Sequence, residues 1–358
     1  MPRKVTAALV IVSVLLGGCT AARRSAETYD KPVRAKAEAL ARLETSDTGV
    51  KWSTSTIGGE VAALYPLGDV VCVYTKANRL VVFDANRGVE RRRMLLPLDL
   101  QFGPYRHDDV LYFSIGDTVY GFDTNTGEEL WTRSLEVPLS SPPTLFAGQI
   151  FAGSRIDIFG AWPVQSNRLA WSILQCRTTE KAAVSGTTVY VPAAGGLLRA
   201  VNVADGEVAW GYPTEREFIT SPALLESGLV IGTEEGGIYR ISEDGKREWL
   251  TVLRRPVKKV FAAGDLVIAM TVPDGGVLLD AESGEELRIV PGVVKLAGVS
   301  DNIACFVKGR NLVAADRATG QEKWQLPLGE FTVVAENAAS NEVYCATKTG
   351  ALVALELK

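Results

Sequence analysis

The side chains that most often carry catalysis are scarce in this sequence. It has 358 residues and one histidine, His107, in the polar stretch 105–109, which is typical of a loop. A zinc site built on several histidines is therefore excluded, and a Ser-His-Asp triad could use only His107. We interpret His107 as a solvated loop side chain, and we predict no catalytic residue, no metal site and no bound cofactor.

Cysteine chemistry is equally restricted by spacing. The sequence contains no CxxC and no CxxCH, so neither a thioredoxin-like redox motif nor haem attachment is indicated. Cys72, Cys305 and Cys345 stand in apolar runs typical of strands, where free cysteine behaves as a small buried hydrophobe. Core packing is the favoured interpretation of these residues. A disulfide between Cys305 and Cys345 stays open, because spacing does not give the Cα separation that a bridge requires.

Composition indicates a folded chain and argues against a nucleic-acid partner. Hydrophobic residues make up 47% of the sequence and charged residues 22%, which is enough apolar surface for a large core. The formal net charge is −4. Because neutralising phosphate requires a basic face, we expect no nucleic-acid partner.

The first residues predict an export signal that ends at a cysteine. A positive start at Arg3 and Lys4 precedes a twelve-residue apolar run, 5–16, that is too short to cross a bilayer. Small residues then lead into Cys19, and this pattern resembles the bacterial lipobox, in which the cysteine becomes the lipidated first residue of the mature chain. The alternative is a plain secretory signal with a chance cysteine. We expect a signal peptide over residues 1–18, and Thr20 favours the outer membrane by the sorting rule of such lipoproteins.

The next segment differs in composition from both of its neighbours. Residues 20–30 are polar, and residues 32–44 are rich in Ala, Leu, Glu, Lys and Arg with a proline at the start. This favours a short helix after a flexible tether. We therefore assign 19–45 to a tether and short helix and 46–358 to the main domain.

A repeat of about forty residues fills the main domain. Each unit has two apolar strands around a Gly-rich turn, then Asp-x-x-x-Gly and a tryptophan four residues later. Such a unit is the length of four short antiparallel strands, which form one propeller blade. The Asp and Gly supply turn chemistry, and the tryptophan offers a flat face for packing between blades. The turn glycines are Gly88, Gly127, Gly206, Gly245, Gly284 and Gly320, and the tryptophans are Trp52, Trp131, Trp171, Trp210, Trp249 and Trp324.

The repeats depart from the pattern in three units and at the two ends of the domain. Arg92 and Arg288 stand where a tryptophan is expected, and Asn167 replaces the glycine of the third unit. The last unit stops before its own turn, whereas the turn and tryptophan, residues 47–52, stand at the start of the domain. We infer that the N-terminal strand completes the last blade and closes a ring of eight. The predicted fold is all-β, an eight-bladed β-propeller.

The units resemble the pyrroloquinoline-quinone-type (PQQ-like) propeller repeat, and segments 123–131 and 316–324 match it closely. An eight-bladed propeller behind a lipobox resembles the BamB family of outer-membrane lipoproteins. The resemblance implies a non-enzymatic scaffold in β-barrel protein assembly, on the periplasmic face of the outer membrane and anchored at Cys19. It also implies a barrel-assembly subunit or another envelope protein as partner, and a protein that is monomeric within its complex.

Two loops between repeats are the candidate partner-binding segments. The first contains Arg216 and Phe218, and the second is basic, with Arg254, Arg255, Lys258 and Lys259. Neither loop carries a contact motif of the family, so the identity of the partner stays open. Two alternatives also remain: a PQQ-dependent dehydrogenase, although the adjacent cysteine pair and long insertions common in such enzymes are missing, and an envelope scaffold that binds polysaccharide or another protein.

Overall fold

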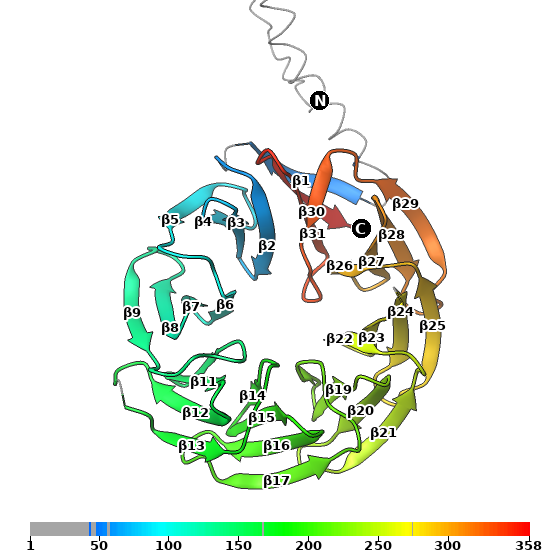
Figure 1. Cartoon of the computed structure of the whole chain (residues 1–358). Helices are drawn as coiled ribbons and strands as arrows, with labels where there is room; N and C mark the ends of the chain where they lie inside the picture. The colour runs from blue at the N-terminus through cyan, green and yellow to red at the C-terminus, as the bar shows by residue number, and fades with distance from the viewer. Residues whose placement is uncertain (1–42, 44–47, 56–57, 167, 274) are drawn as a thin grey trace, which may run out of the picture. The chain divides into compact units, whose positions relative to one another are not determined.

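The computed structural model describes residues 43, 48–55, 58–166, 168–273 and 275–358. The predicted signal peptide, Cys19, the tether and almost all of the predicted helix lie outside these residues, as does Asn167. Every regular element of the described chain is a strand, and no helix found in it is long and apolar enough to cross a membrane. The strands form eight four-stranded antiparallel sheets. Figure 1 shows these sheets arranged as the blades of a ring, so the predicted eight-bladed propeller is confirmed.

Each blade takes four strands, and the first of them faces the axis of the ring. Blades 1 to 4 contain β2 (Val61–Leu67), β3 (Val70–Thr75), β4 (Arg79–Asp84) and β5 (Glu90–Leu95); β6 (Phe102–His107), β7 (Val110–Ile115), β8 (Thr118–Asp123) and β9 (Glu129–Ser134); β10 (Thr144–Phe146), β11 (Gln149–Gly153), β12 (Ile158–Pro163) and β13 (Trp171–Leu174); β14 (Ala183–Ser185), β15 (Thr188–Ala193), β16 (Leu197–Asn202) and β17 (Val208–Pro213). Blades 5 to 8 contain β18 (Ala223–Leu224), β19 (Leu229–Gly232), β20 (Gly237–Ile241) and β21 (Arg247–Val252); β22 (Val257–Ala263), β23 (Leu266–Thr271), β24 (Gly275–Asp280) and β25 (Glu286–Pro291); β26 (Lys295–Val299), β27 (Ile303–Lys308), β28 (Asn311–Asp316) and β29 (Glu322–Pro327); β30 (Phe331–Val334), β31 (Glu342–Thr347), β32 (Leu352–Leu357) and β1 (Thr48–Thr54).

The core follows from the position of each strand in its blade. The second strands are buried along nearly their whole length, as in β23, because neighbouring blades cover both of their faces. They therefore appear in the sequence as continuous apolar runs. The outermost strands, such as β5, are largely exposed. The apolar clusters bridge adjacent blades: Phe151 and Phe159 of blade 3 pack with Val189 and Val201 of blade 4.

The repeated turn joins each blade to the one before it. The carboxylate of Asp84 accepts hydrogen bonds from the backbone N–H groups of Asn86 and Arg87, both at 2.9 Å, and Gly88 takes φ 66°. Trp52 of the preceding blade lies on this glycine, and a Cβ at Gly88 would come within 2.4 Å of the ring. Four of the repeat tryptophans also donate a hydrogen bond from Nε1 to a turn carbonyl of the next blade. These bonds join Trp52 to Ala85 (2.7 Å), Trp171 to Val203 (3.0 Å), Trp210 to Glu243 (2.8 Å) and Trp249 to Ala281 (3.1 Å).

The two arginines found at tryptophan positions occupy the same place. A Cβ added to Gly127 would lie 2.8 Å from Cγ of Arg92, and one added to Gly320 would lie 2.2 Å from Cβ and Cγ of Arg288. The aliphatic stem of a long cationic side chain can cover apolar surface while its charged head stays in water. An arginine stem therefore substitutes for the indole at two of the junctions between blades.

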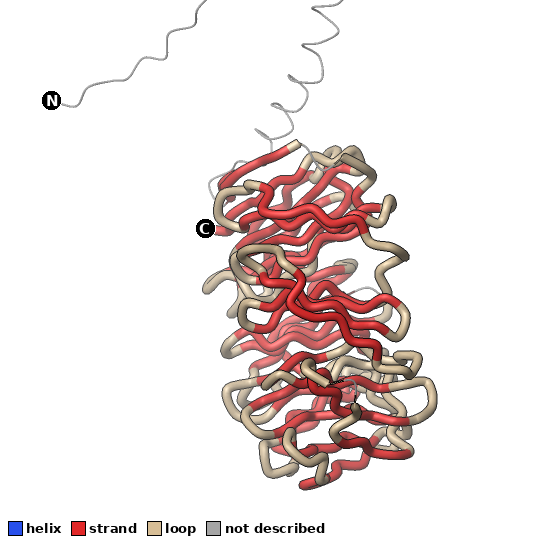
Figure 2. Tube along the Cα trace, turned by 90° about the vertical axis from the view of Figure 1, so that its left-hand side faces the viewer, coloured by secondary structure: helices blue, strands red, loops and turns tan. Residues whose placement is uncertain are grey.

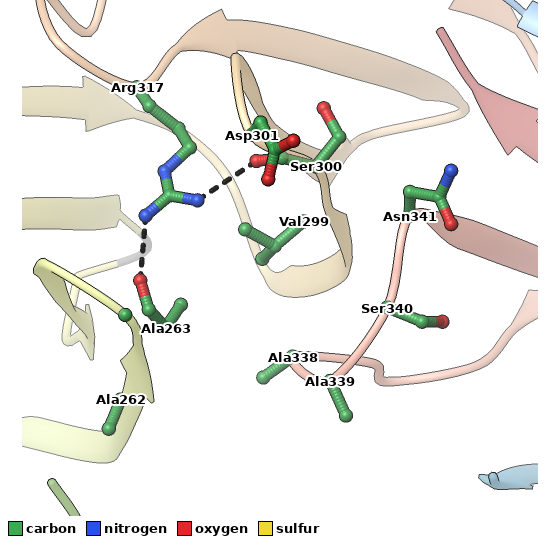
Figure 3. Close-up of a pocket in the computed structure, with 11 residues that line it drawn as sticks. Ala262, Ala263, Val299, Ser300, Asp301, Arg317, Ala338, Ala339, Ser340 and Asn341 are labelled. Carbon is green, nitrogen blue, oxygen red and sulfur yellow. Dashed lines mark hydrogen bonds between the residues drawn. The ribbon is translucent and has the colours of Figure 1, made fainter. Parts of the chain in front are cut away.

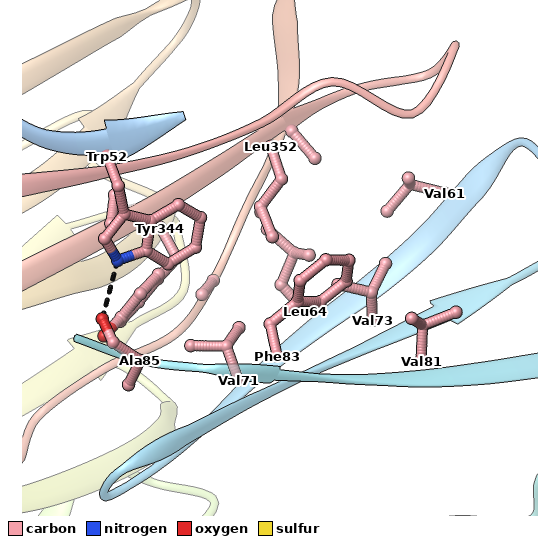
Figure 4. Packing of buried hydrophobic residues seen from close by; sticks show 13 residues of the cluster. Trp52, Val61, Leu64, Val71, Val73, Val81, Phe83, Ala85, Tyr344 and Leu352 are labelled. Atoms are coloured by element: carbon pink, nitrogen blue, oxygen red, sulfur yellow. Dashed lines mark hydrogen bonds between the residues drawn. The ribbon is translucent and has the colours of Figure 1, made fainter. Parts of the chain in front are cut away.

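The N-terminal strand closes the ring, as predicted. Strand β1 pairs antiparallel with β32, from Thr48 opposite Leu357 to Thr54 opposite Leu352. Figure 4 shows Trp52 of β1 packed beside Tyr344 and Leu352 of blade 8 and reaching Ala85 of blade 1. The closing strand thus belongs to the core that joins the last blade to the first.

All four cysteines of the main domain are free and buried, so core packing is confirmed for Cys72, Cys305 and Cys345. Burial raises the pKa of each of these thiols, and that of Cys345 reaches about 12. Because the thiolate is the reactive form, such thiols are poor nucleophiles.

Candidate protein-binding face

Antiparallel strands divide the loops of the ring between its two faces. The turns between second and third strands and the connections from one blade to the next lie on one face, which we call the loop face. The remaining turns, including Asp-x-x-x-Gly, lie on the other, which we call the turn face. Hydrogen bonds within blades support this division, since Leu253 N bonds to Gly236 O on the loop face and Ala281 N to Asp265 O on the turn face. Figure 2 shows the loops gathered on these two sides.

The loop face carries more than half of the exposed large apolar side chains. Thirteen such side chains are exposed in the described chain, and seven of them belong to this face. Exposed apolar side chains that lie close together can mark a surface that a partner covers, whereas single ones are normal on a protein surface. The seven are Leu95, Leu98, Ile156, Leu174, Val252, Val272 and Val294.

Two of these residues lie beside the basic loop that the sequence singled out, and a third stands in the next connection between blades. Val252 ends β21, Val272 follows β23 and Val294 precedes β26, and they are 58%, 40% and 47% exposed. A hydrogen bond of 2.8 Å from Val272 N to Pro256 O ties the turn of blade 6 to the connection after blade 5. We call Val252, Arg254, Arg255, Val272 and Val294 the blade 5–6 corner.

The basic loop itself is held in an unusual conformation. Arg254 is exposed and takes φ 54°, in the left-handed region that costs a residue with a side chain on the order of 1 kcal/mol. The carbonyl of Arg255 lies where a Cβ on Gly236 would be, at 2.2 Å, so the neighbouring turn requires glycine. Buried Leu253 donates to Gly236 O at 2.9 Å. The loop is thus fixed from beneath, and Arg254 is presented to solvent.

The predicted basic loop ends earlier than its sequence suggested. Lys258 and Lys259 belong to β22, the inner strand of blade 6, and not to a loop. A bulge between Val257 and Lys259 leaves both lysines exposed in succession. The side chain of Lys259 forms an ion pair of 2.5 Å with Glu336, on the inner side of the ring. Only Arg254 and Arg255 of this group therefore belong to the loop face.

The first predicted loop has one exposed and one buried candidate. Arg216 is about half exposed and pairs with Glu235 at 2.9 Å. Phe218 is only 7% exposed, with its ring edge-on to Tyr239 at 6.0 Å between ring centroids. Burial also raises the pKa of Tyr239. Because Phe218 is buried against Tyr239, we assign it to the core beneath the loop. Arg216 is kept as a surface residue.

Charges of opposite sign lie beside each other on this part of the face. Exposed carboxylates surround Arg216, whereas the blade 5–6 corner next to them is basic. A surface with apolar groups between acidic and basic neighbours can select a partner by complementary charge. The carboxylates are those of Glu215, Glu217, Glu234 and Glu235.

The turn face carries a cavity that is lined by polar and small residues. A cavity of about 570 Å³ opens among blades 6 to 8, and Figure 3 shows Arg317 at its edge. The guanidinium donates to Ser300 O at 3.0 Å and to Ala263 O at 2.7 Å, and it pairs with Asp265. Its donors therefore hold neighbouring turns together, and the opposite wall is formed by small residues such as Ala338 and Ala339.

Side-chain clusters suited to a metal are missing from the described residues, among which no three His, Cys, Asp or Glu side chains gather. His107 lies 3.5 Å from Asp108, with its ring 5.4 Å from that of Phe146 between centroids. It ends the inner strand β6 instead of standing in the predicted loop.

The eight closed sheets, with a tryptophan or an arginine on each described turn glycine of the repeat, define a β-propeller of PQQ-like repeats. The family model of outer membrane protein assembly factor BamB matches residues 91–223 and 161–291, more than half of the sequence, and the chain belongs to this family.

Individual relatives are distant in sequence. The BamB of Moranella endobia is 20% identical over 67% of this chain, and the match covers 60% of that relative's length. The crystal structure of BamB from Moraxella catarrhalis has a TM-score of 0.70 at 15% identity, covering 87% of this chain and 98% of that one. A quinohemoprotein alcohol dehydrogenase from Pseudomonas putida reaches 0.63 at 11% identity, over 87% and 76%. These two structural similarities show the fold alone.

Proposed function

We propose that this chain is a non-enzymatic scaffold lipoprotein of outer-membrane β-barrel assembly, anchored through Cys19 to the periplasmic face of the outer membrane. Residues 1–18 would be removed as a signal peptide, and 19–45 would tether the propeller of 46–358. Membership of the BamB family supports the assembly role. The lipobox pattern of the sequence supports the anchor, since lipid chains hold a protein at a membrane without spanning it.

The loop face would bind the barrel-assembly subunit, and its exposed apolar groups are the observation that carries this part of the proposal. Valine side chains that are about half exposed stand beside Arg254, which is held in a costly backbone conformation. Apolar anchors next to arginine are the composition that concentrates binding energy in protein interfaces. The blade 5–6 corner is therefore the proposed centre of contact, with Arg216 at its edge.

Photocrosslinking in native membranes tests this proposal. A photoreactive residue would replace Val252, Val294 or Leu98 on the loop face, or Val89 or Leu130 outside it, in the lipidated full chain. We expect crosslinks to the barrel-assembly subunit from the loop-face positions and few from the controls. Crosslinks only to other envelope proteins or to glycan, with the assembly subunit present in the membranes, would support the general envelope scaffold instead.

The dehydrogenase alternative has fold similarity as its only support. Dye-linked alcohol oxidation by the purified chain with added pyrroloquinoline quinone and calcium is its direct test. Turnover above the no-protein background would overturn the non-enzymatic assignment.

A further inference from the structure

A second cavity lies on the inner side of the ring, away from the blade 5–6 corner. It has a volume of about 440 Å³, and the first strands of blades 2 to 5 and the residues beside them form its wall. This volume is within the range of small-molecule sites. Its lining combines one lysine, Lys181, with an apolar surface. That surface is formed by Leu145, Phe146, Val184 and Leu224.

The ammonium group of Lys181 is placed against aromatic rings. Its Nζ lies 3.7 Å from the centre of the Tyr105 ring and 5.8 Å from that of Tyr112. The backbone N–H of Lys181 donates to Ser221 Oγ at 3.1 Å, which fixes the start of the side chain. Burial lowers the pKa of this lysine to about 8, although the ring faces favour the charged form.

No carboxylate of the described residues neutralises this charge at ion-pair distance. The neighbouring acid, Glu180, accepts a hydrogen bond of 3.3 Å from the hydroxyl of Ser221 instead. Two other lysines on the inner side have oxygen partners. Lys259 forms an ion pair with Glu336 at 2.5 Å, and the ammonium of Lys295 donates a hydrogen bond to Val334 O at 2.8 Å. Buried charges in folded proteins are normally paired, so Lys181 differs from its neighbours.

The apolar wall next to Lys181 is ordered by contacts of its own. Tyr112 OH accepts a hydrogen bond of 3.2 Å from the backbone N–H of Leu145, and the rings of His107 and Phe146 lie 5.4 Å apart between centroids. The guanidinium of Arg106 bonds to Asp69 and to Leu67 O and is committed to the turn face. Lys181 is therefore the cation that an incoming anion would meet.

We propose that this cavity binds the carboxylate of a ligand with an apolar body. The carboxylate would pair with the ammonium of Lys181, and the body would lie against Phe146 and Leu224. Two sources share this chemistry: a free amphipathic acid, and the C-terminal residue of a peptide. Preformed shape and one convergent charge are the usual elements of such sites.

Calorimetric titration of the purified full propeller with 3-phenylpropionate tests the proposal. A ligand of this size that meets one charge and an apolar wall is expected to bind with a Kd of about 1 mM or tighter. Lys181→Met should weaken binding at least about tenfold, and Lys181→Arg should restore it to within a few-fold. Lys295→Met is the matched control, because it removes another lysine from the inner side and should leave binding unchanged.

Neutral and peptide ligands complete the test. 3-Phenylpropionamide, which has no charge, should bind at least about tenfold more weakly than the acid. An acetylated tripeptide that ends in leucine is then titrated as free acid and as amide. This separates the two sources of the carboxylate, since only a peptide site would prefer the tripeptide acid to phenylpropionate. Three results would overturn the proposal. The first is equal binding of phenylpropionate and its amide, and the second is equal binding of phenylpropionate by the parent and by Lys181→Met. The third is the absence of heat from both phenylpropionate and the tripeptide acid at 10 mM, about ten times the expected Kd.

Discussion

The stem of Arg288 covers the turn glycine Gly320 of the next blade, at the position where Trp52 covers Gly88. The sequence shows a lost tryptophan, but the contact between blades is retained. Removing this cover by Arg288→Ala should lower the free energy of unfolding by about 1 kcal/mol. Gly320→Ala should cost about 2 kcal/mol or more, because φ is 63° and the new methyl group would collide with Arg288. Urea unfolding measures both, with the exposed Lys246→Ala as control, and an unchanged Gly320→Ala would contradict this account.

Besides its backbone pairing with β32, the closing strand is held by the packing of Trp52 and by one hydrogen bond of its side chain, and two substitutions separate these two contributions. Trp52→Phe keeps much of the ring but leaves the carbonyl of Ala85 without its donor, so we expect a loss of about 1 kcal/mol. Trp52→Ala also opens the cluster between the last and first blades and should cost about 3–5 kcal/mol. Equal losses for the two variants in urea unfolding would show that packing against Tyr344 contributes little.

The blade 5–6 corner should contribute to binding without contributing to stability. Val252→Asp with Val294→Asp changes exposed side chains, so the free energy of unfolding should move by no more than about 0.5 kcal/mol. Recovery of the barrel-assembly subunit in pull-downs from native membranes should fall about tenfold. Val89→Asp with Leu130→Asp is the matched control outside the loop face. Full recovery with the corner variant would place the contact elsewhere.

Lys181 should make stability increase with pH over a defined window. Its pKa of about 8 in the folded chain lies below the ordinary 10.5. Below pH 8 both states hold the proton, and the folded state bears the cost of a buried charge. Between about pH 8 and 10.5 the unfolded chain holds the extra proton, so stability rises. The titratable and charged groups around Lys181 are Tyr105, Arg106, His107, Tyr112 and Glu180.

Lys181→Met should remove this rise. We expect the variant to be more stable than the parent by about 1 kcal/mol at pH 7, with the difference shrinking toward pH 10. Urea midpoints of both proteins at the two pH values give the difference directly, and titration of other lysines and tyrosines cancels in the comparison. A difference that grows with pH would mean that the ammonium is stabilised by its surroundings.

The repeated turn should contribute to acid sensitivity. Hydrogen bonds from Lys323 and from Thr319 lower the pKa of Asp316 to about 2, from an ordinary 3.8. A lowered carboxyl pKa gives stability that is complete above pH 4 and is lost as pH falls toward 2. Asp316→Asn should therefore flatten the acid limb of the stability curve while changing little of its slope above pH 6. An unchanged acid limb would show that the turn keeps its hydrogen bonds after protonation.

The ring could be predicted from sequence because its defining contacts repeat. A Gly and a Trp recur at a spacing of 39 residues since each blade needs the same turn and the same cover, and segment 47–52 supplied the piece missing after β32. The degenerate unit around Trp171 still forms a four-stranded sheet, because β10 to β13 retain their apolar pairing.

The candidate sites were less predictable, because side-chain direction depends on register. The bulge between Val257 and Lys259 breaks the alternation of β22, so the two lysines appeared to be part of a basic loop. Phe218 packs beneath its loop on Tyr239, a contact set by folding of the chain in space. Likewise, Lys181 reaches Tyr105 of blade 2, two blades away, and no local pattern indicates such a distance.

Closure by β1 also sets an order of events for a chain that is synthesised from its N-terminus. Thr48 emerges before the other strands of the ring, but its partner Leu357 belongs to β32, the last of these strands to emerge. Until then β1 has no strand to pair with, and Trp52 has no Tyr344 to pack against. Contacts between distant residues carry a large loop-closure cost and form slowly. The nascent ring is thus an open arc with two unsatisfied strand edges, and a chaperone that shields them until β32 arrives would protect it from aggregation.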